Sequence, residues 1–231
     1  MVKAESSNVK MEDFHEDILV KAMRGNGLGK RELASRTGLS EKRIKGVLEG
    51  GTDEEVIVLS AKELNLDADK LLVSARKEWM PEVVTIRELR QFNMAYGGMM
   101  VNSYAVWDES SRNAWMFDTG PETKPMLDFL ESEKLSLEAI FLTHTHPDHI
   151  ACLEELKQKT GNPQVFVHAL EAIEDANLIE EGFNQNLGNL KLRTLHTHGH
   201  SQGGMTYVIE GLEKPIAVVG DAMFAGSMGG G

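Results

Sequence analysis

Apolar and polar positions follow two different patterns on either side of Pro81. Residues 13–78 carry apolar positions at helical spacing, in short stretches broken by glycines and without strand-like alternation. After Pro81 the chain changes to short apolar runs and alternating segments, which are typical of strands. The pattern therefore predicts a helical domain over 13–78 and a second domain of strands and helices over 82–231.

The helical domain is expected to contain five short helices, with Ser40, Asp53 and Asp67 as N-caps because their side chains can accept a bond from the first turn. The second domain is expected to begin with strands and then to alternate strands with helices. Helices are predicted within 13–25, 29–38, 40–50, 53–66, 67–79, 124–135 and 149–161. Strands are predicted within 82–89, 100–108, 113–120, 137–144, 163–170, 190–198, 204–211 and 214–224.

Composition narrows the class of protein. Of the 231 residues, 41% are hydrophobic and 26% are charged, as in most globular proteins, and no apolar run approaches the ~18 residues of a membrane span. The N-terminal stretch contains no apolar core of a secretory signal. The single cysteine, Cys152, excludes an internal disulfide framework and is expected to be a small packed thiol. These features predict a cytoplasmic protein without a membrane partner.

The net charge of −12 is unevenly distributed, with −1 in residues 1–80 and −11 in residues 81–231. An acidic second domain argues against general binding of polyanions by its surface. The stretch 21–45 differs, because its eight basic residues are accompanied only by Glu32 and Glu41. This basic stretch needs an explanation of its own.

The stretch FLTHTHPDHI, residues 141–150, places three histidines and an aspartate directly behind an apolar run that is expected to be a strand. Two further candidates follow at the ends of later predicted strands: LHTHGHSQGG supplies His196, His198 and His200, and AVVGDAMF supplies Asp221. Imidazole and carboxylate suit zinc, iron or manganese, and a set without thiolates argues against a closed structural zinc site. The spacing favours a catalytic metal site with open coordination positions.

The motifs THTHPDH, THGHS and GD, preceded by FDTG at 117–120, resemble in order and separation those of the metallo-β-lactamase superfamily of hydrolases, over about residues 82–231. The segment GDAMFAGSMG is most similar to the glyoxalase II and persulfide dioxygenase branches. The resemblance implies an αββα sandwich for the second domain. The expected fold class of the chain is α+β, with a small all-α bundle in front of that sandwich.

The resemblance implies that His144, His146 and His200 hold a first metal ion and that Asp148 and His149 hold a second, with Asp221 between the two ions. Zinc, as one or two ions, is the expected cofactor, and iron or manganese are alternatives.

The remaining acidic and imidazole side chains receive other expectations. Asp118 in FDTG is implied to be a buried residue that orients ligands without being one. His196 and His198 stay unassigned, as residues that line the pocket. His168 is expected to cap a strand-to-helix turn rather than to touch the site, and His15 is expected at the surface.

The expected reaction is hydrolysis of a thioester or an ester in a small-molecule substrate by hydroxide formed at the metal. Asp148 is the expected catalytic residue, which accepts a hydrogen bond from the hydroxide and orients it. The alternative is a mononuclear iron enzyme like the persulfide dioxygenases, with His144, His200 and Asp221 as ligands.

Two departures from the family pattern bear on this expectation. Gly230 stands where the glyoxalase-like branches usually have arginine, which puts an anionic or glutathione-derived substrate in doubt. The chain ends at Gly231, before the second half of the family's fold and its last histidine ligand. We therefore expect the sequence to be part of a longer protein, and the chain alone to be short of one metal ligand.

The stretch LASRTGLSEKRIKGVLEGG resembles the helix-turn-helix of the lambda-repressor and Cro-like family, in its small, turn and core positions. The resemblance implies DNA contacts by four residues of the second helix, Ser40, Lys42, Arg43 and Lys45. With such contacts the protein would be a DNA-binding regulator that responds to a metabolite or to the metal. Gly46 weakens the second helix, so a helix pair used for homodimerisation or protein docking remains the alternative.

Overall fold

The structure, a computed structural model, describes Met11 and residues 13–231. Most of the N-terminal stretch for which no export signal is predicted lies outside the described residues. The chain forms two compact units, one of residues up to Val83 together with Met223–Gly231, and one of Val84–Ala222. The domain boundaries expected from the sequence, 13–78 and 82–231, stay predictions.

The first unit contains the five helices that the apolar spacing predicted. They are α1 (His15–Gly25), α2 (Lys30–Thr37), α3 (Glu41–Leu48), α4 (Glu54–Glu63) and α5 (Ala68–Ala75). Ser40, Asp53 and Asp67 are N-caps, as expected, and their side chains accept backbone N–H bonds from the first turns of α3, α4 and α5. The apolar faces of the helices enclose one core, which includes the fully buried Leu33 and Ile57.

The prediction that His15 lies at the surface is wrong, because its side chain is only 3% exposed. His15 precedes Leu19 and Met23 by one and two helical turns, so it lies on the buried face of α1. Its Nδ1 lies 2.7 Å from Oε2 of Glu16, and its Nε2 lies 2.9 Å from the carbonyl oxygen of Gly51. The bond at Nε2 compensates part of the burial of the imidazole, whereas Nδ1 and Oε2 of Glu16 lie close together without the geometry of a hydrogen bond.

Helices α2 and α3 are joined by a short turn that contains Gly38 at φ 73°. The left-handed backbone conformation at this position favours glycine. Whether the pair is a helix-turn-helix of the lambda-repressor type stays a prediction. The same unit ends with two short paired strands, β11 (Met223–Phe224) and β12 (Ser227–Met228).

The second unit contains a six-stranded sheet in the order β1-β2-β3-β4-β5-β6. The strands β1, β2 and β3 are antiparallel neighbours, whereas β3, β4, β5 and β6 run parallel. Their bounds are β1 (Leu89–Tyr96), β2 (Met99–Trp107), β3 (Asn113–Phe117), β4 (Ser136–Phe141), β5 (Gln164–His168) and β6 (Asn177–Ile179). Helix α6 (Lys124–Ser132) connects β3 to β4, and α7 (Pro147–Ile150) and α8 (Leu153–Lys159) connect β4 to β5.

A four-stranded antiparallel sheet, in the order β10-β9-β8-β7, forms the other layer of strands. Its strands are β7 (Asn184–Leu187), β8 (Leu190–His196), β9 (Met205–Glu210) and β10 (Ile216–Val218). Short 3-10 turns follow two strands, η1 (Ala169–Glu171) after β5 and η2 (Gly220–Ala222) after β10.

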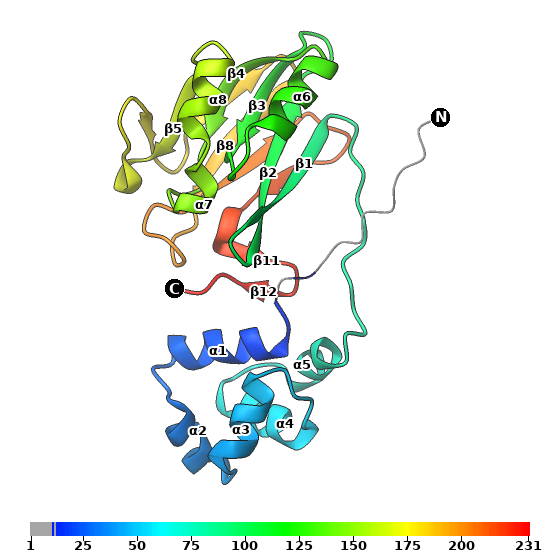
Figure 1. The fold of residues 1–231 in the computed structure, drawn as a ribbon, viewed down its shortest axis with the longest axis vertical. Helices are drawn as coiled ribbons and strands as arrows, with labels where there is room; N and C mark the ends of the chain where they lie inside the picture. The colour runs from blue at the N-terminus through cyan, green and yellow to red at the C-terminus, as the bar shows by residue number, and fades with distance from the viewer. Residues whose placement is uncertain (1–10, 12) are drawn as a thin grey trace. The chain divides into compact units, whose positions relative to one another are not determined.

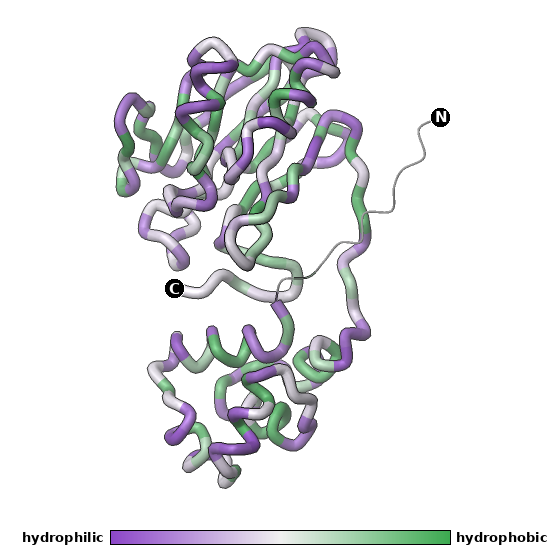
Figure 2. Tube along the Cα trace, viewed as in Figure 1, coloured by the Kyte–Doolittle hydropathy of each residue, from purple (hydrophilic) through white to green (hydrophobic). Residues whose placement is uncertain are grey.

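Alternating side chains of the six-stranded sheet build two cores, one on each face. On one face, Met116 and Ile140 pack with Leu156 of α8 and with residues of α6. On the other face, Trp115 and Phe141 pack with Tyr207 and its neighbours in the four-stranded sheet. Figure 1 shows α6 and α8 lying over β3 and β4, and Figure 2 shows apolar positions along the strands with hydrophilic ones in the connecting loops.

The second unit is thus a helix layer, a sheet and a second sheet. The second outer helix layer of the expected αββα sandwich is not found among the described residues 84–222. The α+β class is confirmed in its coarse form, a helical part followed by a part that mixes helices and sheets.

Three predicted segments are corrected. Residues 82–88 form no strand, since Val83 and Val84 are exposed and have no neighbouring strand to pair with. The single helix expected over 149–161 is two helices, α7 and α8, and the strand expected over 214–224 is divided by η2 into β10 and β11. Strands β6, β7 and β12 were not predicted, and β1 was predicted only at Leu89. Within the described part of the chain, none of the helices combines the length and apolar character needed to cross a bilayer.

Candidate metal centre

The topology brings the chemistry-bearing loops to one edge of each sheet. The parallel strands β3, β4 and β5 end on the same side, and their ends lead into Asp118, the loop 142–149 and Glu171. Strands β8 and β10 are both antiparallel to β9, so they also end on a common side. The loop that contains His200 follows β8, and Asp221 follows β10.

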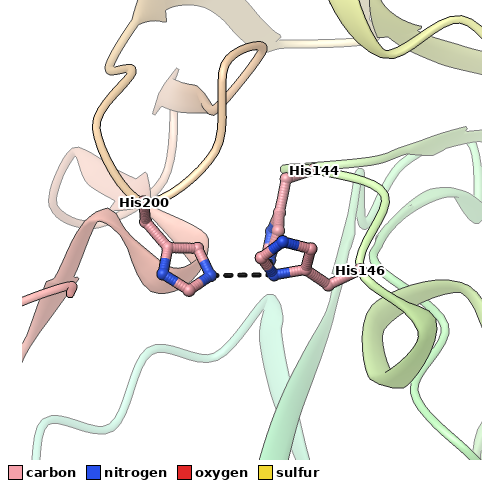
Figure 3. A group of neighbouring side chains, drawn as sticks. All are labelled: His144, His146 and His200. Carbon is pink, nitrogen blue, oxygen red and sulfur yellow. Dashed lines mark hydrogen bonds between the residues drawn. The ribbon is translucent and has the colours of Figure 1, made fainter. Parts of the chain in front are cut away.

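Three imidazoles converge on one point. His146 Nδ1 lies 3.0 Å from His144 Nε2 and 2.9 Å from His200 Nε2, and the three nitrogens all lie within 4.8 Å of one another. Figure 3 shows the three rings pointing toward each other from the loops that follow β4 and β8. One nitrogen of His146 therefore faces two other ring nitrogens, an arrangement that a cation accepting all three lone pairs would satisfy.

A second group adjoins the first. His149 Nε2 lies 3.2 Å from Asp221 Oδ1, and with His144 these residues form the other set whose ligand atoms lie within 4.8 Å. The second carboxylate oxygen of Asp221 lies 3.6 Å from His200 Nε2, so the carboxylate joins the two groups. Asp148 approaches from the side, with Oδ2 at 3.6 Å from His149 Nε2.

Hydrogen bonds to Nδ1 of His144 and His149, on the side away from the site, determine which ring nitrogens face it. Asp118 is a buried carboxylate that accepts bonds from the backbone N–H and the hydroxyl of Thr143, each at 2.7 Å. Because the hydroxyl proton of Thr143 is donated to Asp118, its oxygen is the acceptor for His144 Nδ1 at 3.1 Å. Asp118 also accepts from His149 Nδ1 at 2.8 Å. Both imidazoles therefore carry a proton on Nδ1 and present Nε2 to the site.

The electrostatics of the two inner histidines differ. Burial lowers the pKa of His144 to about 4, and the charge of His149 acts in the same direction. Burial also disfavours a charged His149, but the carboxylates of Asp118 and Asp221 outweigh it and raise the pKa of His149 to about 10. His144 is thus neutral at neutral pH, whereas His149 without a cation beside it keeps a proton between two carboxylates.

Asp221 reaches the site because the residue before it is glycine. A Cβ at Gly220 would lie 2.3 Å from the hydroxyl oxygen of Thr143, and Gly220 has φ 51°. Both the close approach and the left-handed backbone exclude ordinary side chains. Burial raises the pKa of Asp221, but the contact with His149 outweighs it and leaves the pKa below its usual range.

The structure thus brings the six sequence-predicted ligand candidates to one place, with Asp148 at the margin. His168 lies outside both groups and accepts a bond from the N–H of Leu170 at 3.1 Å, which agrees with the expected turn cap. Its ring stacks on His196, with centroids 4.2 Å apart, and His196 in turn contacts His198. Sequence reasoning gave no role to Thr143, which opens the THTHPDH motif but carries no metal-binding group, or to Glu171, which stands outside the motifs.

A cleft of about 710 Å³ opens beside the first group. Its walls are His146, Thr145 and Glu171 on one side and the loop of His196, His198 and His200 on the other, with Leu170 at the rim. A cleft of this size accommodates a small organic molecule. Imidazoles and carboxylates that converge beside such a cleft form a donor set suited to zinc, iron or manganese.

The comparisons with known proteins agree with this geometry. A family model described as the metallo-beta-lactamase superfamily matches residues 96–230. The chain is 29% identical to the probable metallo-hydrolase YqgX of Bacillus subtilis, over 59% of this chain and 72% of that protein. It is 30% identical to the hydroxyacylglutathione hydrolase GloC of Haemophilus influenzae, over 55% of this chain and 69% of that protein.

Other curated hydroxyacylglutathione hydrolases match over 42% to 49% of their own length, so the chain spans about half of them. Among solved structures, the BLEG-1 B3 metallo-beta-lactamase is similar with a TM-score of 0.54 and 23% identity, over 61% of this chain and 75% of that one. At that identity the likeness concerns the fold. Because the family model matches more than half of the chain, the chain belongs to the metallo-beta-lactamase superfamily.

Proposed function

We propose that the unit Val84–Ala222 carries the metal-binding site of a hydrolase that cleaves a thioester or an ester in a small molecule. One observation carries the proposal: two adjoining groups of ligand atoms, joined by the carboxylate of Asp221, meet beside the cleft. The curated relatives named hydroxyacylglutathione hydrolases support a thioester as the substrate class.

The residues of the site divide between two ions. His144, His146 and His200 would hold one ion, Asp148 and His149 a second, and Asp221 would lie between them. Zinc is the ion that we propose, and iron or manganese accept the same donors. A bound ion supplies a lowered pKa for coordinated water and polarises the substrate carbonyl.

The chain's own side chains supply orientation. Asp148 would accept a hydrogen bond from the attacking water and aim it at the carbonyl carbon, because its carboxylate stands at the margin of the second group. Asp118 and Thr143 keep the imidazoles of His144 and His149 in the tautomer that leaves Nε2 free.

In the proposed reaction the water oxygen forms a bond with the carbonyl carbon and the C–S bond breaks, which yields a carboxylate and a thiol; one proton of the water ends on the thiol and the other is released to solvent. The leaving thiolate needs little help from an acid, because thiol pKa values lie near ~8.5. An ester would release an alcohol by the same sequence of bonds.

Metal analysis and a thiol-release assay test the proposal. The full chain would be loaded with zinc, iron or manganese in turn and offered a hydroxyacylglutathione, a short-chain acyl thioester and an aryl ester. We expect turnover of one thioester or ester with one metal, and a loss of about a hundredfold or more in Asp221→Ala. Asp128→Ala, at an exposed ion pair of α6, is the control and should retain activity.

Three outcomes are informative. Turnover that depends on metal and on Asp221 supports the proposal. A folded chain that binds metal and cleaves no member of the panel contradicts the hydrolase assignment. A single iron per chain with oxygen consumption on a persulfide would replace the hydrolase by the mononuclear dioxygenase alternative.

For the helical unit we propose contact with DNA through α3. The exposed Lys42 on α3 supports this proposal, as does the turn at Gly38 that joins α2 to α3. Lys45 is also exposed, and its Nζ lies 3.5 Å from Oε1 of Glu49. Arg43 is engaged elsewhere, since its guanidinium contacts Asp53 at 2.9 Å and Glu55 at 2.7 Å. Ser40 uses its hydroxyl as the N-cap of α3. A homodimer through the helical unit stays a prediction.

A further inference from the structure

Glu171 occupies a position between the two loops that carry the first group of histidines. It is the last residue of the 3-10 turn η1, which follows β5. One loop is 142–149, which contains His144 and His146, and the other is 197–204, which contains His200. Both loops approach the half-buried side chain of Glu171 from opposite sides.

Each oxygen of Glu171 is committed to one loop. Oε2 accepts bonds from the backbone N–H of Thr145 at 2.6 Å and from its hydroxyl at 2.9 Å. Oε1 accepts from the hydroxyl of Ser201 and from the backbone N–H of Gly203 at 2.9 Å. Thr145 lies between His144 and His146, and Ser201 directly follows His200. The carboxylate is therefore bonded next to all three imidazoles of the first group.

The backbone of the second loop is shaped for this contact. A Cβ at Gly203 would lie 2.8 Å from Cγ of Glu171 and 3.1 Å from Nδ1 of His168, so a larger residue would push the loop away. The loop is also closed on itself by the bond from Thr197 N–H to the Gly204 carbonyl at 2.8 Å. Because this bond closes the base of the loop, we expect bonds at Ser201 and Gly203 to restrain His200 as well.

Glu171 is ionised in this position. Burial raises the pKa of Glu171, but the bonds from Ser201, Gly203 and Thr145 outweigh burial and leave the pKa below its ordinary value. The four hydrogen bonds that the Glu171 carboxylate accepts are charge-assisted, and such bonds are shorter and stronger than neutral ones. A backbone bond from Met205 N–H, directly after the second loop, to the Thr143 carbonyl at 2.8 Å also links this region to the first loop, on the far side of His144 from Thr145.

We infer that Glu171 is a positioning residue that joins the two histidine loops and sets the spacing of His144, His146 and His200 for a metal ion. Asp118 orients the inner side of the site through Thr143 and His149, and Glu171 does the same for the outer side through Thr145 and the loop 197–204. The inference rests on the metal binding proposed above. It identifies Glu171 as the residue that fixes the spacing of the three imidazoles before an ion binds.

The direct test is binding of cobalt(II) to the ion-free full chain, measured by competition with a chromophoric chelator and by the visible absorption of the bound ion. Glu171→Ala should weaken cobalt affinity by roughly ten- to a hundredfold and change the absorption bands, as loss of an outer partner of a metal ligand does. Glu171→Gln should fall between, because an amide oxygen can accept for one loop but the amide nitrogen cannot accept for the other. Glu174→Ala, at an exposed glutamate of the same connection, should bind like the unchanged chain.

A second pair of variants separates positioning from a general loss of folding. Ser201→Ala removes one of the four bonds and should weaken cobalt binding several-fold in the unchanged chain. In the Glu171→Ala background the same change should have little further effect, since the bond partner is already gone. Equal effects of Ser201→Ala in both backgrounds would overturn the inference, because the loops would then not be joined through Glu171.

The outcomes also separate this inference from the proposed function. If the unchanged chain binds no cobalt, both fail. If the unchanged chain binds cobalt and the folded Glu171→Ala chain binds it with the same affinity and absorption bands, only the role of Glu171 fails.

Discussion

Charged and titratable side chains are used in opposite ways in the two units of the chain. In Val84–Ala222, Asp118 and Glu171 accept hydrogen bonds from the loops that carry the metal-ligand candidates. The ligand atoms of these imidazoles and carboxylates then converge on common positions. In the helical unit, Arg36 of α2 pairs with Glu63 and Arg43 of α3 pairs with Asp53. The first arrangement leaves binding capacity for a cation, whereas the second largely satisfies the charges within the protein.

The number of charged residues in a stretch is therefore a poor guide to whether that stretch can bind a ligand. The basic stretch 21–45 is prominent in the sequence, yet several of its cations pair with nearby acids. Among the six ligand candidates, hydrogen bonds fix the tautomers and directions of His144 and His149. Four predictions, in decreasing order of the size of the effect, test this contrast.

Asp118→Ala should have the largest effect. The variant removes the acceptor for Thr143 and for His149 in a buried place, which should cost roughly 3–5 kcal/mol of unfolding free energy. Urea unfolding followed by the fluorescence of the buried Trp115 measures the change. Glu138→Ala, at an exposed position of β4, is the matched control. A similar midpoint of urea unfolding for the two variants would mean that the hydrogen bonds to Asp118 do not stabilise the site.

Gly220→Ala should have the next largest effect. The added Cβ meets Thr143 at 2.3 Å and needs a left-handed backbone, so we expect a cost of about 1–3 kcal/mol and a shift of Asp221 away from His149. Thermal unfolding and cobalt affinity should both decline. Gly98→Ala is the control, because a Cβ there meets nothing within 4 Å and the backbone conformation is ordinary. Unchanged cobalt binding in Gly220→Ala would refute this account of the Gly-Asp pair.

The pH dependence of metal binding should follow from His149. Without a cation, its pKa of about 10 means that the proton contributes stability fully below the ordinary value of 6.5, and that this contribution is lost as the pH rises through about 10. Metal binding has the opposite sign, because the ion takes the lone pair that the proton occupies. Cobalt affinity at the second group, which contains His149, should therefore rise by about tenfold per pH unit between about pH 7 and about pH 9. His149→Gln should flatten this slope, and a flat profile in the unchanged chain would contradict the protonated state.

The smallest effects are expected in the helical unit. At low salt, replacing Lys42 and Lys45 by alanine should weaken binding to a DNA duplex and reduce the salt dependence by roughly one unit per lysine. Arg43→Ala should change DNA affinity less, because Asp53 and Glu55 already neutralise its charge. Fluorescence anisotropy of a labelled duplex measures both. If the unchanged chain shows no binding at low salt, the proposal of DNA contact is withdrawn.

Local sequence patterns predicted much of the fold. The five helices follow the apolar spacing, and the caps at Ser40, Asp53 and Asp67 follow from side-chain chemistry alone. The strand expected at 82–89 failed because Val83 and Val84 favour an extended chain but find no partner strand. The surface position expected for His15 was wrong because His15 shares a helix face with Leu19 and Met23. Its place on this apolar face, and not the polarity of its imidazole, determines its burial.

The candidate site was predictable where its residues form motifs and unpredictable where they do not. His144, His146 and His149 share one loop, and His200 and Asp221 stand at strand ends, so sequence order alone singles them out. Glu171 is a lone glutamate in a short turn, and its role depends on the contact of two loops that are distant in the sequence. Only tertiary structure reveals such a contact.

The donors of the centre come from both sheets. An ion shared by His144 and Asp221 would tie together chain segments separated by every strand from β5 to β10, as a removable cross-link would. Closing so long a loop restricts the unfolded ensemble, so a loaded chain should resist heat and proteases better than an empty one. The side chains proposed to prepare a carbonyl for attack would then also govern how long the molecule survives.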